Sequence, residues 1–226
     1  MRTLKIIFAA LGILVFTGYV WYKINFPVDE FNYRLSVELT DGNKVWAGSS
    51  VIKVRIGHQP SGGSIPEATT RVFGEAIFVQ LDNGKNLLAL LAEGPDIQHI
   101  DYPVPVVLRS FGLTHNRQDL AKVKTLKGKS HTLEPRFFPT FATFDNITDP
   151  KTARIVLPQD FSRVYGENIS LKSVKIEITD DPVTEQLQSK LPWWGSSGRP
   201  AAVAWRAMIG WRPGESIEPE QLFIRK

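Results

Sequence analysis

Apolar and polar residues alternate most regularly over residues 31–40. Every second residue there, beginning with Phe31, is apolar, and the residues between are polar. Successive side chains of a strand point to opposite faces, so this pattern predicts a strand with one face on a core and the other in water. Asp41-Gly42 predicts a turn, and the alternation over 52–56 predicts a second strand that forms a hairpin with the first.

Further strands are predicted along the chain. Alternating or continuous apolar runs place them at about 71–81, 87–91, 153–157 and 170–179. Asn83-Gly84 lies between the first two, and Asn-Gly is the strongest short hairpin signal because both residues can take positive φ. Residues 57–70 are rich in Gly, Pro and Ser and predict a long loop. The strands before residue 92 are therefore expected to form a four-stranded antiparallel meander.

Three helices are predicted between and after these strands. Apolar residues at i, i+3, i+4 and i+7 predict a helix over 104–111. A short helix is predicted over 116–128, because Asn116 and Asp119 resemble a capping box. An Asp-Pro pair at its start predicts a third helix over 181–191.

The chain begins with an apolar segment that predicts a membrane-spanning helix. Residues 6–22 contain no charge, and residues 4–24 would form a helix of about 31 Å, which matches the hydrocarbon thickness of a bilayer. Lys5 and Lys23 can reach the two interfaces, and Pro27 stops the helix. The side chains expected to anchor the chain are those of Leu4, Ile6, Ile7, Phe8, Leu11, Ile13, Leu14, Val15, Phe16, Tyr19, Val20, Trp21 and Tyr22.

Two other interpretations of this segment stay open. A cleaved signal peptide needs small residues just before its cleavage site, but Ala9 and Ala10 lie inside the apolar run and its end is aromatic. A buried core helix fits 17 uncharged residues at the start of a chain poorly. An uncleaved anchor is preferred. Arg2 and Lys5 then place the N-terminus in the cytoplasm, so the rest of the chain is expected in the periplasm.

The predicted organisation is a membrane anchor over 1–24, a short linker over 25–30 and a β-rich extracytoplasmic domain over 31–226. Residues 128–139, which are basic and contain two prolines, are a candidate subdivision of that domain. The expected fold class is α+β and β-rich, an antiparallel sheet with a few short helices. The expected location is the inner (cytoplasmic) membrane, crossed once.

Composition excludes several classes of function. The 226 residues carry a net charge of +4, and without Arg2 and Lys5 there remain 25 basic and 23 acidic residues. No run of like charge forms an obvious basic patch, so nucleic acid is not an expected partner. The chain has no cysteine, which excludes disulfides, thiolate nucleophiles and metal sites built on cysteine.

No motif identifies a catalytic residue, a cofactor or a metal. The four histidines, His58, His99, His115 and His131, are too far apart in sequence for ligation from one helix. The string Gly195-Ser196-Ser197-Gly198 lacks the spacing of a nucleophile elbow and reads as a linker. The adjacent carboxylates Asp180 and Asp181 favour a helix cap over a glycosidase pair. A non-enzymatic role is favoured, and catalytic activity stays open.

Tryptophan is concentrated near the C-terminus, where four of the six lie within 19 residues: Trp193, Trp194, Trp205 and Trp211. One interpretation makes them an interaction surface, because Trp is enriched at binding hot spots and membrane interfaces. The other makes them core residues beneath the last strands, and this second interpretation is favoured.

Several short stretches resemble those of a bacterial protein family. They are Gly48-Ser49-Ser50-Val51, Gly74-Glu75-Ala76 leading into Asp82-Asn83-Gly84, and residues 176–184 with Leu191-Pro192-Trp193. In combination they are similar to a family of uncharacterised bacterial single-pass proteins, anchored in the membrane at the N-terminus, for which no activity is known. The resemblance implies an inner-membrane setting and brings no site residues with it.

The favoured function is a membrane-tethered extracytoplasmic module that binds or scaffolds another component of the bacterial envelope. Its expected partners are the lipid bilayer, through the N-terminal helix, and an envelope protein; no cofactor is expected. The alternative is an envelope hydrolase or transferase whose active-site residues come from distant loops. A deep cleft with a buried His–Asp pair or paired carboxylates would favour the alternative.

Overall fold

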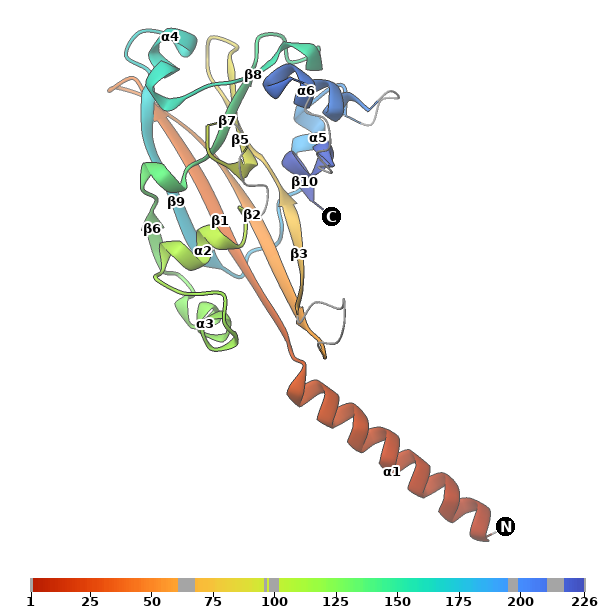
Figure 1. Cartoon of the computed structure of the whole chain (residues 1–226). Coiled ribbons are helices and arrows are strands. Elements are labelled where there is room, and N and C mark those ends of the chain that lie inside the picture. The colour runs from red at the N-terminus through yellow and green to blue at the C-terminus, as the bar shows by residue number, and fades with distance from the viewer. Residues whose placement is uncertain are drawn as a thin grey trace. The chain divides into compact units, whose positions relative to one another are not determined.

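The structure is a computed structural model (Figure 1) that describes residues 2–60, 68–95, 97, 102–194, 199–210 and 218–225, without the side chains of residues 2–7 and 9. Its described residues have an α+β fold with two antiparallel sheets. The strands are β1 (Val28–Thr40), β2 (Val45–His58), β3 (Ala68–Glu75), β4 (Ile77–Gln80), β5 (Asn86–Glu93), β6 (Ser130–Thr132), β7 (Pro139–Phe144), β8 (Ala153–Ile155), β9 (Ser170–Thr179) and β10 (Ile224–Arg225).

The α-helices are α1 (Arg2–Asn25), α2 (Pro105–Ser110), α3 (Arg117–Val123), α4 (Phe161–Tyr165), α5 (Leu187–Lys190) and α6 (Pro200–Ile209). Short 3₁₀ helices are η1 (Lys124–Leu126), η2 (Pro135–Phe137), η3 (Pro150–Thr152), η4 (Pro158–Asp160) and η5 (Pro219–Leu222). These elements belong to two compact units, one of Met1–Glu30 with Arg55–Arg71 and the other of Phe31–Val54 with Val72–Lys226. The boundaries predicted at residue 24 and within 128–139 stay predictions.

The first unit contains α1, which runs for 24 residues and ends two residues before Pro27. A proline cannot continue a helix and disfavours helical conformation in the residue before it, so α1 stops where the sequence predicts. The Tyr22 and Phe26 rings pack 5.2 Å apart at this end. The amide of His58 donates to the Pro27 carbonyl at 3.2 Å. Among the described residues, no helix is long and apolar enough to cross a membrane.

The larger sheet has the strand order β10-β3-β2-β1-β9-β6. β1 and β9 form its longest described antiparallel pair, with one irregularity after Glu38. From Phe31 onward every second side chain of β1 is buried, because the alternation puts the apolar residues on one face. The strands predicted over 31–40 and 170–179 are confirmed. The fully buried side chains of β1 are Tyr33, Leu35, Val37 and Leu39.

The single strand predicted over 71–81 is wrong, because this segment forms two strands in different sheets. β3 ends at Glu75, and β4 begins at Ile77 in a smaller sheet of order β4-β5-β7-β8. Gly74 has a φ of 148°, and a Cβ added to it would lie 3.0 Å from the Ile52 side chain. Only glycine fits this conformation and this space easily. The predicted meander is therefore divided between the two sheets.

The smaller sheet is built on the predicted β4–β5 hairpin. Gly84 has a φ of 80°, and the amide of Leu81 donates to the Lys85 carbonyl at 2.9 Å, which confirms the Asn-Gly turn. Every residue of β5 and of β7 is buried. β7 does not follow from the sequence pattern, since a strand buried on both faces lacks the polar alternation that identifies a strand.

Helices α2 and α3 confirm two predictions. α2 occupies most of the predicted range 104–111 and has a proline in its first turn, where the missing N–H costs nothing. Asn116 is the N-cap of α3, and its side-chain oxygen accepts from the amide of Asp119 at 2.8 Å. The chain turns at Gly128 with a φ of 76°.

The helix predicted over 181–191 is wrong for most of its length. Asp181 pairs with Arg34, and its carbonyl accepts from the side-chain amide of Asn32 at 2.9 Å, so it joins β1 and caps no helix. Only α5 is helical, and it begins where the carboxylate of Glu75 accepts the amide of Leu187 at 2.8 Å. A carboxylate 112 residues away in sequence therefore sets the start of this helix.

A hydrophobic core lies between the smaller sheet and the C-terminal segments. Helix α6 lies beside β8 (Figure 1) and contributes Ala204 and Trp205 to it. The rings of Trp193 and Phe223 meet edge to face at 5.9 Å. Other buried members are Leu88, Leu90, Ala142, Phe144, Leu191 and Leu222.

Candidate functional site

The two ends of the smaller sheet differ in chemistry. At one end, Glu93, the last residue of β5, lies opposite Pro139, the first residue of β7, and β8 stops short of this end with Ile155 opposite Ala142. At the other end, Phe144 of β7 lies opposite Ala153 of β8. The second end holds a polar cluster, and the first borders a cavity.

Asn86 organises the polar end. Its side-chain amide donates to the Phe144 carbonyl at 2.9 Å and accepts from the Phe144 amide at 3.0 Å, so one side chain substitutes for a strand partner. Thr143 Oγ1 donates to the Asn86 carbonyl at 2.6 Å. These groups are buried, where an unmade hydrogen bond is costly. The contacts therefore close the end of the sheet.

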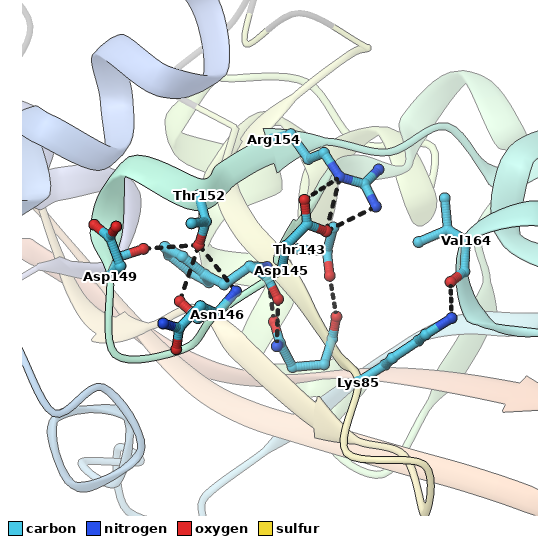
Figure 2. Close-up of polar contacts among 10 residues, drawn as sticks. Lys85, Thr143, Asp145, Asn146, Asp149, Thr152, Arg154 and Val164 are labelled. Carbon is cyan, nitrogen blue, oxygen red and sulfur yellow. Dashed lines mark hydrogen bonds and ion pairs between the residues drawn. The ribbon is translucent and has the colours of Figure 1, made fainter.

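The neighbouring polar residues are paired with the protein itself. Figure 2 shows Arg154 directed at the carboxylate of Asp145, with Nε at 3.1 Å, and Lys85 directed at the Val164 carbonyl at 2.6 Å. The side chain of Thr152 donates to the Asn146 carbonyl at 2.9 Å. Since these groups face one another and no common space, we interpret the cluster as structural.

The cavity at the other end has a volume of about 620 Å³, within the usual range of small-molecule sites. Its wall is formed by the end of β5, the start of β7 and the segment after β8, and most of it is apolar. Prolines lack the backbone N–H, so much of the wall offers no donor. The apolar side chains include Pro95, Pro135, Phe138, Pro139, Phe141, Val156, Leu157 and Pro158.

Two arginines and one glutamate supply the charge at the cavity. Nη1 of Arg109 lies 3.0 Å and 2.9 Å from the two carboxylate oxygens of Glu93. The side chain of Glu93 is 7% exposed and that of Arg109 is 43% exposed, so the pair extends from the wall to the solvent. Arg136 is the second arginine. The lining thus has two guanidinium groups and one carboxylate, and a second carboxylate, that of Glu134, contacts Arg136 from outside it.

Phe137 positions both guanidinium groups. Its ring centroid lies 5.8 Å from Cζ of Arg109 and 4.6 Å from Cζ of Arg136, distances typical of cation–π contacts. Tyr102 fixes the backbone here, because its hydroxyl donates to the Phe137 carbonyl at 3.1 Å. Burial raises the pKa of Tyr102 well above its ordinary value, so the hydroxyl keeps its proton at neutral pH.

Arg136 has donors that its acidic neighbour, Glu134, does not use. Its Nε lies 2.9 Å from an oxygen of Glu134, and both side chains are well exposed. Its two Nη groups have no partner among the described residues. The cavity can therefore hold an apolar group against its wall and an anionic group at these donors. Among its described lining residues, Glu93 is the one carboxylate, and both its oxygens contact Arg109.

A smaller hollow of about 300 Å³ lies beside β3 and β10. Its buried carboxylate, Glu75, accepts the amides of Gln186 and Leu187 at 2.7 Å and 2.8 Å. Its guanidinium, Arg225, donates to the Leu91 carbonyl at 3.2 Å. Glu75 and Arg225 therefore serve the fold, and the third charged lining residue, Glu185, is exposed. The larger cavity is the better candidate site.

Among the described residues, the histidines considered for metal ligation are not brought together. His58 lies 2.9 Å from the carboxylate of Asp29 in the first unit, while His115 and His131 are exposed. His99 and the Gly195–Gly198 string lie outside the described residues. Among the residues that the structure describes, no three His, Asp or Glu are placed to hold a metal ion.

The predicted anchor residues lie on one helix. Their described side chains are exposed, from 36% for Val20 to 71% for Leu14. The side chains of Leu4, Ile6 and Ile7 lie outside the description. The contact of this helix with lipid stays a prediction.

Of the four C-terminal tryptophans, the described ones lie in or against the hydrophobic core. Trp193 is 5% exposed and Trp205 is 8% exposed, while Trp194 packs against this core and is half-buried. Trp211 lies outside the described residues. Burial explains Trp193 and Trp205 without a partner; their role in an interaction surface stays a prediction.

The residues of the cavity are missing from the sequence-based candidates. They come from four separate segments and form no motif of fixed spacing. One signal does point to them: Arg136 and Phe137 lie in the basic, proline-containing segment 128–139. The sequence marks this segment as a boundary, whereas in the structure Pro135 and Pro139 line the cavity.

The fold and the cavity define an α+β protein with a candidate small-molecule site at one end of its smaller sheet. Comparison with known proteins adds no family: no family model, no curated protein and no solved structure matches the chain. Function must therefore be inferred from the cavity and the sequence.

Proposed function

We propose that the protein is a membrane-tethered binding module of the bacterial envelope, which holds an apolar ligand in the cavity at the end of β5, β7 and β8. The cavity is the observation that carries this proposal. Its volume of about 620 Å³ and its wall of prolines and phenylalanines suit a ligand group that avoids water. We propose that this cavity is where the expected envelope component binds.

The anchor part of the proposal rests on α1 and its sequence. The uncharged run over 6–22 lies within one helix of 24 residues, and its described apolar side chains are exposed. Exposed side chains such as Leu14 and Phe16 are unfavourable in water and favourable in lipid. Arg2 and Lys5 support a cytoplasmic N-terminus, which would put the remaining chain in the periplasm.

The same cavity gives the alternative, an envelope hydrolase or transferase, no specific support. Among the described lining residues, Glu93 is engaged by Arg109, and none is a histidine, serine or aspartate. A general acid–base pair needs two groups within reach of one substrate. We therefore argue for binding alone.

Placement is tested with single cysteines, since the natural chain has none. Asn43→Cys, at the exposed β1–β2 turn, and Thr3→Cys, which leaves Arg2 and Lys5 in place, are labelled with a membrane-impermeant maleimide in spheroplasts. The Asn43→Cys variant is expected to react before lysis and the Thr3→Cys variant only after it. Carbonate washing should leave the full chain in the membrane fraction. The reverse labelling pattern, or release by carbonate, would contradict the tether.

Ligand binding is tested with a dye at the cavity. The full-length Gln159→Cys variant, which has its new thiol on the cavity lining, is labelled with acrylodan and placed in nanodiscs of phosphatidylcholine. Hexadecanol, an uncharged single-chain probe, is expected to shift the dye emission saturably. Leu157→Glu in the wall should abolish the shift, whereas Val45→Glu, at an exposed apolar position of β2, should not. No saturable shift would contradict the proposed site.

A further inference from the structure

The rim of the cavity has two guanidinium groups, those of Arg109 and Arg136, which a purely apolar ligand would not use. We infer that the ligand is a single-chain amphiphile with one carboxylate, such as a long-chain fatty acid, whose chain fills the cavity and whose head pairs with Arg136 and Arg109. This inference rests on the proposed function, since it names the ligand class of the same cavity.

Unused guanidinium donors support a head with one negative charge. The lining has two guanidinium groups and one carboxylate. Glu134, outside the lining, contacts Arg136 only through Nε, so the two Nη groups of Arg136 have no partner among the described residues. Glu93 uses a single nitrogen, Nη1 of Arg109. A guanidinium fork presents several donors that match the two oxygens of a carboxylate.

The position of the arginines supports a head at the mouth of the cavity. The side chain of Arg136 is 70% exposed and that of Arg109 is 43% exposed, so both guanidinium groups reach solvent beside an apolar wall. The ring of Phe137 contacts both guanidinium groups. The donors are thus held in place before a ligand arrives, which lowers the entropic cost of binding.

The size of the cavity supports one chain. A volume of about 620 Å³ is in the middle of the range for small-molecule sites, and the wall offers apolar contact from Phe138, Phe141 and Leu157. A neutral lipid would fill this wall and leave the Nη groups of Arg136 unused. A short anion would use the arginines and leave the wall in contact with water.

The test compares palmitate with hexadecanol, using the acrylodan-labelled Gln159→Cys chain in phosphatidylcholine nanodiscs at mildly alkaline pH. Palmitate should bind at least about tenfold more tightly, the effect expected of a hydrogen-bonded charge pair. Arg136→Gln should remove this preference and leave hexadecanol binding unchanged. Arg206→Gln, which removes an exposed arginine on α6, should leave both affinities unchanged.

The outcomes separate the two proposals. Equal affinity for palmitate and hexadecanol, or a preference that survives Arg136→Gln, would overturn the carboxylate inference and leave the apolar site in place. Tighter binding of lysophosphatidylglycerol than of palmitate would also overturn it, because the head would then be a phosphate. If neither palmitate nor hexadecanol shifts the dye, both the inference and the proposed function fail.

Discussion

Nη1 of Arg109 on α2 lies 3.0 Å and 2.9 Å from the two carboxylate oxygens of Glu93, the last residue of β5. The contact joins α2 to the smaller sheet at the edge of the cavity. Glu93 is 7% exposed, so its charge depends on this one guanidinium for compensation, whereas Arg109 also reaches water. Removing Arg109 should therefore destabilise the fold more than removing Glu93, because it leaves a buried charge unpaired.

Arg109→Met is predicted to lower the free energy of unfolding by about 2–3 kcal/mol, because it leaves a buried carboxylate without its partner. Denaturation of the full chain in detergent, followed by tryptophan fluorescence, measures the change. The double variant Glu93→Leu with Arg109→Met removes both charges and should recover most of the loss. A double variant as unstable as Arg109→Met alone would show that the unpaired charge is not the cause.

Glu75→Gln is predicted to destabilise the protein by about 1–3 kcal/mol. The two oxygens of Glu75 accept the amides of Gln186 and Leu187, and a glutamine would turn an –NH₂ group toward one of them. The loss should appear first as fraying of α5, which hydrogen exchange at its amides can detect. Glu185→Gln, at an exposed neighbouring carboxylate, is the control and should change little.

The sequence predicts elements whose side chains alternate between a core and water. β1 is the clearest case, since its apolar residues from Phe31 to Leu39 are all buried. It does not predict β7, whose six residues are all buried and show no alternation. The split of 71–81 depends on the packing of Gly74 against Ile52, a contact between distant segments that no local pattern encodes.

Long-range contacts also explain why the cavity is not predicted. Asp181 satisfies the local rule for a helix cap, yet it pairs with Arg34 on β1, and Glu75 from β3 takes over the start of α5. In the same way Arg109 and Arg136 are 27 positions apart, and both contact the ring of Phe137 in the folded chain. Residue types at fixed spacing cannot reveal such a site.

Asp119→Asn is predicted to change how stability depends on pH. Hydrogen bonds from Lys122 and from Thr114 hold the pKa of Asp119 well below its ordinary value. A carboxyl with a lowered pKa stabilises the fold fully above its unfolded pKa of about 3.9, and this contribution is lost as the pH falls below that value. Wild type should therefore exceed Asp119→Asn in stability at neutral pH, and the difference should disappear in strong acid.

Denaturant unfolding of both proteins across the acid range provides the measurement. The control is Glu167→Gln, which removes an exposed carboxylate between α4 and β9 and should leave the dependence on pH unchanged. A gap between wild type and Asp119→Asn that stays constant down to strong acid would show that the ionised form of Asp119 is not what stabilises α3.

Gly48→Ala is predicted to destabilise the protein by about 1–3 kcal/mol, because β2 passes directly against β4 at this point. An added Cβ would lie 2.7 Å from the Phe78 carbonyl oxygen and 2.8 Å and 2.9 Å from the side chains of Ile77 and Val79. A backbone oxygen cannot rotate away as a flexible side chain can, so the two strands must separate.

Gly57→Ala, on the same strand, is the matched control for Gly48→Ala. Its nearest neighbour would be the Thr69 hydroxyl at 3.3 Å, which can turn aside, and replacing a strand glycine otherwise favours the folded state slightly. The difference between the two variants in free energy of unfolding therefore isolates the β2–β4 contact. Equal stability would mean that β4 does not pack on β2 at Gly48. It would contradict the arrangement in which β2 and β4 belong to different sheets and pack against each other at this point.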